Sequence, residues 1–467
     1  MLTRIVQPSP ALEAFLDALR RDLSQPQRDH LLQLVDGLLV CDESKTLAAL
    51  QRQFLDSTDP SDWADFLRIS PWRPEEVRTS LRRRQVAWLV AEAQRRGFPQ
   101  VLYVNLDDSL GEKDKQTSHL EPVDWFHDHN ESTPRQPRYQ KAFCYLECTP
   151  RAGDLTATVE LRLYLRDKTV RRLNRHRPPE HRLHFRSKFR SAREILESLK
   201  PLLPPGWTIY VQFDSWYASE GLLKYIHRRG WHAVCALKSN RKFSGQRLSQ
   251  FGATLRHKRY TPVRVTAADG KATTYYVRDA VGRLSELPFD VRVMFSKRHP
   301  RARARAYFAG TDLARTVVET LRGYGGRWSC EVVNFYTKTR LGLADSRGRS
   351  YEGGGAVCGR GASGLGLRRT AVGSRAIGSD PVPGRRDPTA SRRPCSGVAE
   401  GGRGARDSHR GRGVGAGSVL AADRLRRRGL HDQSRRAQGR VCSYNALEVH
   451  CPRRRRGIAR RNPSKTR

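Results

Sequence analysis

The sequence predicts a mixed α/β protein, in which a helical segment precedes a sheet that is flanked by helices and carries a β-rich insertion. Apolar residues recur at helical spacing through roughly the first hundred residues. The apolar period then shortens to two, and three strand patterns in series precede alternating helices and strands. After residue 352 the composition turns to Arg and Gly. We therefore expect three parts, at residues 1–98, 99–350 and 351–467.

The first part is predicted to be an all-α domain. Four stretches carry the helical pattern: PALEAFLDALRRDL, RDHLLQLVDGLLV, ESKTLAALQRQFL and PEEVRTSLRRRQVAWLVAEAQRRG. The last begins at Pro74 with two Glu in its first turn and ends before Gly97, which are typical helix start and stop signals. Its Arg82, Arg83 and Arg84 are either phosphate contacts or an ordinary solvated helix face, and the pattern alone does not separate the two.

The second part is predicted to be a mixed sheet. Strand patterns occupy 101–107, 141–148, 156–165, 208–214 and 233–238, with helical patterns at 191–203 and 219–230. A further β pattern covers about 258–310, and a helical stretch follows from about 313 to 344. We place the β insertion at about 243–312.

The charge of the chain indicates a polyanionic partner. The formal net charge is +40 and the mean hydropathy is −0.68, so nucleic acid is the default partner and a membrane surface the competing one. No run of 18 apolar residues predicts a membrane span, and the amino terminus lacks the apolar core of a signal peptide. Nine scattered Cys fit a reducing compartment, so we expect a cytoplasmic protein.

The third part differs in composition from the rest. Residues 351–467 contain 27 Lys and Arg and 8 Asp and Glu. The sequence from residue 353 onward contains no Phe or Trp. One interpretation is a disordered Arg/Gly tail that binds nucleic acid. The other interpretation is a frameshift in a GC-rich gene. If permitted codons are written for Glu352 to Thr370 and one G is removed, the new frame can be translated as EAVERYVAVVRLAWAYVER, which has the pattern of an amphipathic helix. The nucleotide sequence distinguishes them.

Carboxylates follow two predicted strands. Asp214 ends TIYVQFD, and Asp107 and Asp108 end VLYVNLDD about a hundred residues earlier. Ligands and catalytic groups in open α/β sheets lie at the carboxyl ends of strands, and carboxylate oxygens suit Mg²⁺ or Mn²⁺. A strand-end Asp is also a common helix N-cap, and for Asp214 alone that interpretation is the stronger one.

A second polar pattern lies in GYGGRWSCEVVNFYTKTRLGL. Tyr324, Arg327, Glu331 and Lys338 stand at offsets 0, 3, 7 and 14, which would place them on one stripe of a continuous helix. The Gly pair that follows Tyr324 argues against a helix that early. The alternative is a surface helix with a charged face.

In this combination the chain resembles the bacterial insertion-sequence transposases of the DDE type that carry a Tyr-x2-Arg-x3-Glu-x6-Lys signature and an all-β insertion before the catalytic Glu. All four signature positions match, as do LDDS on the first strand and FDSWYAS on the fourth. The resemblance covers roughly residues 20–350. It implies an RNase H-like fold in which two Asp and one Glu hold a pair of Mg²⁺ ions, with Mn²⁺ as a possible substitute.

The resemblance also assigns individual residues. The family's first Asp directly precedes a Thr or Ser, which places it at Asp108, with Asp107 as the alternative register. The second Asp falls on Asp214 and the Glu on Glu331. The phosphates near the cleavage site would be contacted by Tyr324, Arg327 and Lys338. At the same sheet edge we expect Lys238 and Arg241 to contact the DNA backbone.

The expected function is therefore that of a DNA transposase. It would cleave double-stranded DNA at terminal inverted repeats with Mg²⁺, recognise those repeats partly through residues 1–98, and join the freed 3′-hydroxyl to target DNA as a synaptic homodimer at the nucleoid. The alternatives are an RNase H-like nuclease without strand transfer and, if the tail is frameshifted, an impaired copy that acts only as a basic DNA-binding protein.

Overall fold

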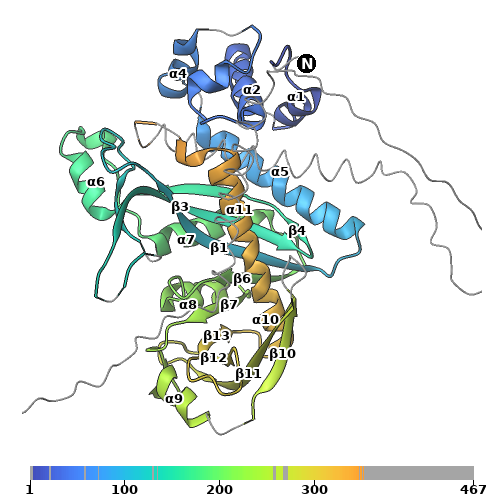
Figure 1. Cartoon of the computed structure of the whole chain (residues 1–467). Coiled ribbons are helices and arrows are strands. Elements are labelled where there is room, and N and C mark those ends of the chain that lie inside the picture. The colour runs from blue at the N-terminus through green and yellow to red at the C-terminus, as the bar shows by residue number, and fades with distance from the viewer. Residues whose placement is uncertain are drawn as a thin grey trace, which may run out of the picture. The chain divides into compact units, whose positions relative to one another are not determined.

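The structure is a computed structural model (Figure 1). It describes residues 4–19, 23–56, 59–71, 73–128, 131–133, 135–255, 259–266, 272–345, 348–349 and 351. The predicted Arg/Gly-rich tail lies outside the described residues, apart from Tyr351.

The amino-terminal segment is helical, as predicted. Its helices are α1 (Pro10–Asp17), α2 (Gln25–Val40), α3 (Leu47–Gln51), α4 (Pro60–Arg68) and α5 (Pro74–Arg95). An apolar core that includes Leu34, Val35 and Trp63 holds the first four together, and it continues into α5 and the sheet. Helix α5 ends where expected, because Gly97 adopts φ +66°, a conformation that favours glycine. No described helix combines the length and the apolarity that crossing a bilayer requires.

The predicted mixed sheet is confirmed, and it is larger than expected. Its strand order is β10-β11-β12-β13-β7-β6-β1-β3-β2, and β4 and β5 also pair with β3. Strand β1 runs antiparallel to β3 and parallel to β6, which in turn runs parallel to β7. Three antiparallel strands followed by two parallel ones form the RNase H-like unit. The bounds are β1 Val101–Glu112, β2 Asp124–His127, β3 Tyr139–Ala152, β4 Leu155–Thr156, β5 Glu160–Tyr164, β6 Thr208–Phe213 and β7 His232–Leu237.

The β insertion extends this sheet. Strand β13 (Ala306–Gly310) pairs antiparallel with β7, and β12 (Asp290–Lys297), β11 (Ala272–Arg283) and β10 (Thr261–Thr266) follow outward. The insertion is not all-β, because it begins with a small hairpin, β8 (Lys242–Phe243) and β9 (Gln246–Arg247), and a helix, α9 (Leu248–Thr254). The sequence LSQFGATL has apolar residues at helical spacing there, and Phe251 stacks on Phe295 of β12.

Successive residues of β1 point to opposite faces of the sheet, and different helices cover the two faces. Leu102, Val104 and Leu106 pack in a core with residues of α5, α7 (Lys188–Leu199) and α8 (Glu220–Arg228). We call this the α7 face. The other face carries Tyr103, Asn105 and Asp107 and is covered by α10 (Val317–Gly325), a 3-10 turn at Gly326–Trp328, and α11 (Ser329–Phe335) (Figure 1). We call it the α11 face.

Helix α5 docks on the α7 face through a buried ion pair. Arg82 is 4% exposed and donates to Glu160 of β5, which is 1% exposed. Arg162 and Arg78 approach the same carboxylate at 3.5 Å and 3.8 Å. The suggestion that Arg82 contacts phosphate is therefore wrong, because this side chain neutralises a buried carboxylate.

The remaining described elements connect these layers. The patterns in the sequence did not indicate β2 or α6 (Asp167–Asn174), which have few apolar residues. The other short turns are η1 (Pro179–His181), η2 (Lys200–Leu202), a π-helical turn at Tyr336–Arg340 and η6 (Leu343–Asp345).

Candidate active site

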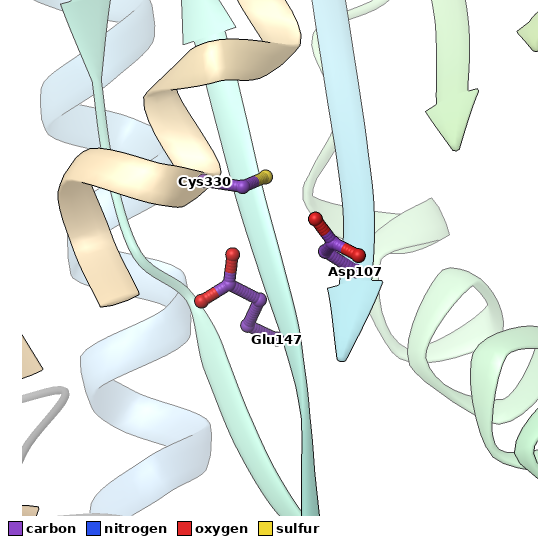
Figure 2. A group of neighbouring side chains, drawn as sticks. All are labelled: Asp107, Glu147 and Cys330. Atoms are coloured by element: carbon purple, nitrogen blue, oxygen red, sulfur yellow. The ribbon is translucent and has the colours of Figure 1, made fainter. Parts of the chain in front are cut away.

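A cluster of potential metal ligands lies where β1, β3 and α11 meet. One ligand atom from each of Asp107, Glu147 and Cys330 lies within 4.8 Å of the others. Figure 2 shows the three side chains pointing toward one another from two strands and the helix. Asp107 and Glu147 are register partners in the antiparallel ladder, so their side chains share the α11 face.

The Glu147 carboxyl is the most deeply buried acid of this cluster. The residue is 0% exposed, and its Oε2 atom has no hydrogen-bond partner among the described residues. Its Oε1 accepts a long bond of 3.5 Å from Nδ2 of Asn334, whose Oδ1 accepts a 2.8 Å bond from the Tyr145 hydroxyl. Burial raises the pKa of Glu147 well above its usual range, and the charge of Asp107 adds to this.

Cys330 supports Glu147 as a thiol. Burial raises the pKa of Cys330 well above its usual value, and the neighbouring acids Glu147 and Asp107 raise it further. The neutral thiol is hydrogen-bonded to the Glu147 carboxylate, which lowers the pKa of that acid in part. A neutral thiol is a poor ligand for a hard cation, so the oxygens of the cluster determine which metal fits.

Asp107 is at the centre of the charged groups on this face. Its Oδ2 accepts a 2.5 Å bond from Nη1 of Arg327, in an ion pair whose side chains are 15% and 10% exposed. Burial raises the pKa of Asp107 to about 6; Arg327 acts against this, while Asp214 and Asp108 add to it.

Asp214 follows β6 directly. The register of β6 places Gln212 opposite Asn105, so Asp214 comes at the level of Asp107. Its Oδ1 accepts backbone bonds from Trp216 at 2.9 Å and Tyr217 at 3.3 Å. Asp214 therefore caps this turn, whereas Ser219 caps α8, so the helix-cap interpretation does not apply to α8. Burial raises the pKa of Asp214, and Arg327 opposes the rise.

Glu331 and Lys338 face the same group of charges from α11 and the π-helical turn. Burial raises the pKa of Glu331, Asp107 raises it further, and Arg327 and Lys338 lower it. Burial lowers the pKa of Lys338 even though Glu112, Glu147 and Glu331 favour its charged form. The mutual influence of these groups shows that Glu331 and Lys338 belong to the electrostatic surroundings of Asp107.

The floor of the site is polar. Asn105 on β1 is register partner to Thr149 on β3 and to Gln212 on β6, and all three are 0% exposed. Nδ2 of Asn105 donates to the Ser329 hydroxyl at 3.1 Å. This hydrogen bond attaches the start of α11 to the sheet. The α7 face, in contrast, is packed by apolar side chains.

The group around Asp107 carries more negative than positive charge. Four carboxylates (Asp107, Glu147, Asp214 and Glu331) meet two cations (Arg327 and Lys338), so this group has a formal excess of two negative charges. Burial and this excess of negative charge raise the pKa of all four acids. Clustered carboxylate oxygens, one of them buried without a partner, fit a divalent cation such as Mg²⁺ or Mn²⁺.

Asp108 lies on the opposite face of the sheet. Nζ of Lys188 bonds its Oδ2 at 2.6 Å, and the hydroxyl of Tyr217 bonds its Oδ1 at 2.8 Å. Among the described residues, neither the expected set of Asp108, Asp214 and Glu331 nor the same set with Asp107 brings its ligand atoms within 4.8 Å of one another. The alternative register, Asp107, has the closer acidic neighbours.

The residues predicted to contact DNA differ in their exposure and in their partners. Tyr324 is 5% exposed and its hydroxyl donates to the Phe213 carbonyl at 3.4 Å, directly before Asp214. Lys238 is exposed, and its Nζ lies 4.9 Å from the ring centre of Trp216. Arg241 pairs with Glu286 at 3.5 Å. Sequence reasoning missed Glu147, although a Glu inside the apolar run FCYLEC was a signal.

Comparisons with known proteins agree with a nuclease site. A family model described as "DDE superfamily endonuclease" matches residues 15–276, a range that ends before Glu331. No curated protein matches the chain. Among solved structures, the chain is similar to a cryo-EM structure of a piggyBac transposase synaptic complex with hairpin DNA, at 13% identity over 79% of this chain and 73% of that one. The TM-score of 0.36 does not establish a common fold.

Proposed function

Because the chain belongs to the DDE superfamily endonuclease family, we propose that it is a DNA transposase that cleaves element ends and transfers the freed strand to target DNA. The observation that carries the proposal is the group of four carboxylates around Asp107, which lies within β1 next to Asp214, the residue directly after β6. Phosphodiester cleavage needs charge stabilisation at the attacking and leaving oxygens, and such a site can hold the cations for it.

The residues that would hold divalent cations are Asp107, Asp214 and Glu331. We propose Asp107 in place of Asp108, since Asp108 already has a cation partner in Lys188 on the other face. Two bound Mg²⁺ or Mn²⁺ ions would supply activation of the attacking oxygen and stabilisation of the leaving oxygen. The protein's own contribution is to hold the three carboxylates, one within β1, one directly after β6 and one on α11.

Arg327 has two roles in this proposal. Without metal it neutralises Asp107, as the 2.5 Å ion pair shows. When Asp107 has another cation partner, the guanidinium can form a bidentate contact with a phosphate oxygen pair. Lys338 would supply a point charge to the same phosphate, while Tyr324 supports the strand end through the Phe213 carbonyl.

Double-stranded DNA is the proposed partner. The net charge of +40 supports it, and so does the exposed Lys238, which contacts Trp216, a residue two positions after Asp214. Residues 1–98 would bind terminal inverted repeats, and two copies would form the synaptic complex at the nucleoid. The bacterial insertion-sequence origin is likewise a proposal, which rests on the Tyr-x2-Arg-x3-Glu-x6-Lys pattern.

A strand-transfer assay with paired element ends, a target plasmid and Mg²⁺ tests the proposal. We expect Mg²⁺-dependent nicking at the ends and joined products. Nicking without joining would support a nuclease without strand transfer. DNA binding without nicking, in the chain as it stands but not in a version whose reading frame is restored after Glu352, would support the impaired copy. No Mg²⁺-dependent nicking by either version contradicts the proposal.

A further inference from the structure

We infer that Glu147 is a fourth carboxylate of the metal site and offers its Oε2 atom to the cation held by Asp107. The inference rests on the proposed function, since it assigns one more ligand to the same site. It adds a residue from β3, a strand that supplies none of the ligands implied by the resemblance.

The first argument is position. Glu147 is the register partner of Asp107 across the β1–β3 ladder, and the two side chains point toward each other (Figure 2). Strand β3 lies on one side of β1 and β6 on the other. Asp107 is therefore flanked by Glu147 on one side and Asp214 on the other, so it can share a cation with each neighbour.

The second argument is the state of the Glu147 side chain. Its Oε2 is buried and has no hydrogen-bond partner among the described residues, although it lies within the acidic cluster. A buried carboxylate oxygen without a partner is strongly unfavourable unless a ligand completes it. Asn334 binds the other carboxyl oxygen, Oε1, and one oxygen of Glu147 lies within 4.8 Å of a ligand atom of Asp107.

Glu160, a second buried acid of this sheet, has cation partners, whereas the Oε2 atom of Glu147 has no hydrogen-bond partner among the described residues. Glu160, on the neighbouring strand β5, is 1% exposed and forms ion pairs with Arg82, Arg162 and Arg78. Glu147 is equally buried, but among the described residues it forms no ion pair with Lys or Arg. Glu160 is therefore surrounded by Arg side chains, whereas the charged neighbours of Glu147 include the acid Asp107.

The chemistry of the neighbours selects the class of cation. Oxygen atoms from Asp107 and Glu147 suit a hard divalent ion rather than a soft metal. Glu147 would thus raise the affinity of the site for Mg²⁺ or Mn²⁺.

The test measures Mn²⁺ binding to metal-free full-length protein without DNA, by electron paramagnetic resonance of free Mn²⁺ and by the Mn²⁺-dependent rise in Tm. The variants are Glu147→Gln, Glu160→Gln as the control on β5, and Asp107→Asn. We expect Glu147→Gln to weaken Mn²⁺ binding about tenfold or more while its metal-free Tm stays the same or rises. Glu160→Gln should lower the metal-free Tm and leave Mn²⁺ affinity unchanged.

The outcomes separate this inference from the proposed function. If Asp107→Asn loses Mn²⁺ binding and Glu147→Gln keeps it at the wild-type level, Glu147 is not a ligand and the inference is overturned. If Asp107→Asn also binds as tightly as wild type, the metal assignment of the proposed function fails as well. Should the Gln variant not fold, Glu147→Asp, which shifts the carboxylate by one methylene, gives the same comparison, and unchanged affinity again overturns the inference.

Discussion

The two faces of the central sheet treat their buried acids in opposite ways. On the α7 face, Asp108 pairs with Lys188, and Glu160 pairs with Arg82. On the α11 face, Asp107 and its acidic neighbours outnumber the adjacent cations Arg327 and Lys338 by a formal charge of two. Asp107 and Asp108 are adjacent in the chain, so the strand pleat alone assigns one to each environment.

This difference between the faces separates charged groups that stabilise the fold from charged groups that could bind a ligand. A buried ion pair in which each charge has a partner holds elements together, as Arg82 and Glu160 hold α5 on the sheet. A group of acids without enough cations is unfavourable by itself and is maintained where a ligand completes it. The predictions below test this distinction.

The largest effect is expected at the unbalanced face. Asp214→Asn removes a carboxylate charge but keeps the side-chain shape, so Mg²⁺-dependent cleavage should fall on the order of a thousandfold. A gel assay on an end-containing DNA substrate measures it. Lys238→Ala is the control for metal binding. It removes a proposed DNA contact outside the carboxylate group, so the affinity of the protein for Mn²⁺ should not change. Cleavage that survives Asp214→Asn would remove Asp214 from the site.

At the balanced face the effect should be on stability. Arg82→Met leaves Glu160 buried with weaker partners, and we expect a loss of about 3 kcal/mol in the free energy of unfolding. The double variant Arg82→Met with Glu160→Met should recover most of this loss. Urea denaturation measures both. An Arg82→Met protein as stable as wild type would show that this pair does not hold α5.

The faces should also differ in pH dependence. The folded protein keeps the Asp107 proton up to a pKa of about 6, above the unfolded value of about 3.9, so this stabilising term is fully present below pH 4 and is lost as pH rises through 6. Between pH 4.5 and 7.5 in EDTA, wild type should therefore lose roughly 2 kcal/mol relative to Asp107→Asn. Urea titrations at the two pH values measure this. Parallel stability changes in both proteins would contradict it.

The smallest effect concerns the exposed rim of the site. Lys238→Ala should weaken DNA binding only a few fold and reduce the slope of log K against log salt by about one. Fluorescence anisotropy over a salt series measures it. An unchanged slope would show that Lys238 does not contact phosphate.

Much of the fold could be predicted because the patterns were strong. The apolar spacing of α5, the alternation in β1 and β3 and the buried run of β6 identified the elements of the sheet. The join between β13 and β7 could not be predicted, since pairing of strands about 75 residues apart in the chain leaves no local pattern. Helix α9 was missed because seven residues give a weak period.

The site was predictable only in part. The sequence indicated Asp214 as an acid at a strand end and Glu331 as an acid in a helical stripe, but the choice between Asp107 and Asp108 depended on which one faces α11. A one-residue change of register moves a side chain to the other face, and adjacent Asp residues give no signal about it. Glu147 stood in an apolar run, where its partners were invisible without the β1–β3 register.

The most direct test compares Asp107→Asn with Asp108→Asn in Mn²⁺ binding by the metal-free protein. The account predicts that Asp107→Asn weakens binding about tenfold or more, whereas Asp108→Asn changes it little and instead lowers Tm, since Lys188 loses its partner. Loss of Mn²⁺ binding in Asp108→Asn, with wild-type binding in Asp107→Asn, would contradict the assignment of the α11 face as the metal site.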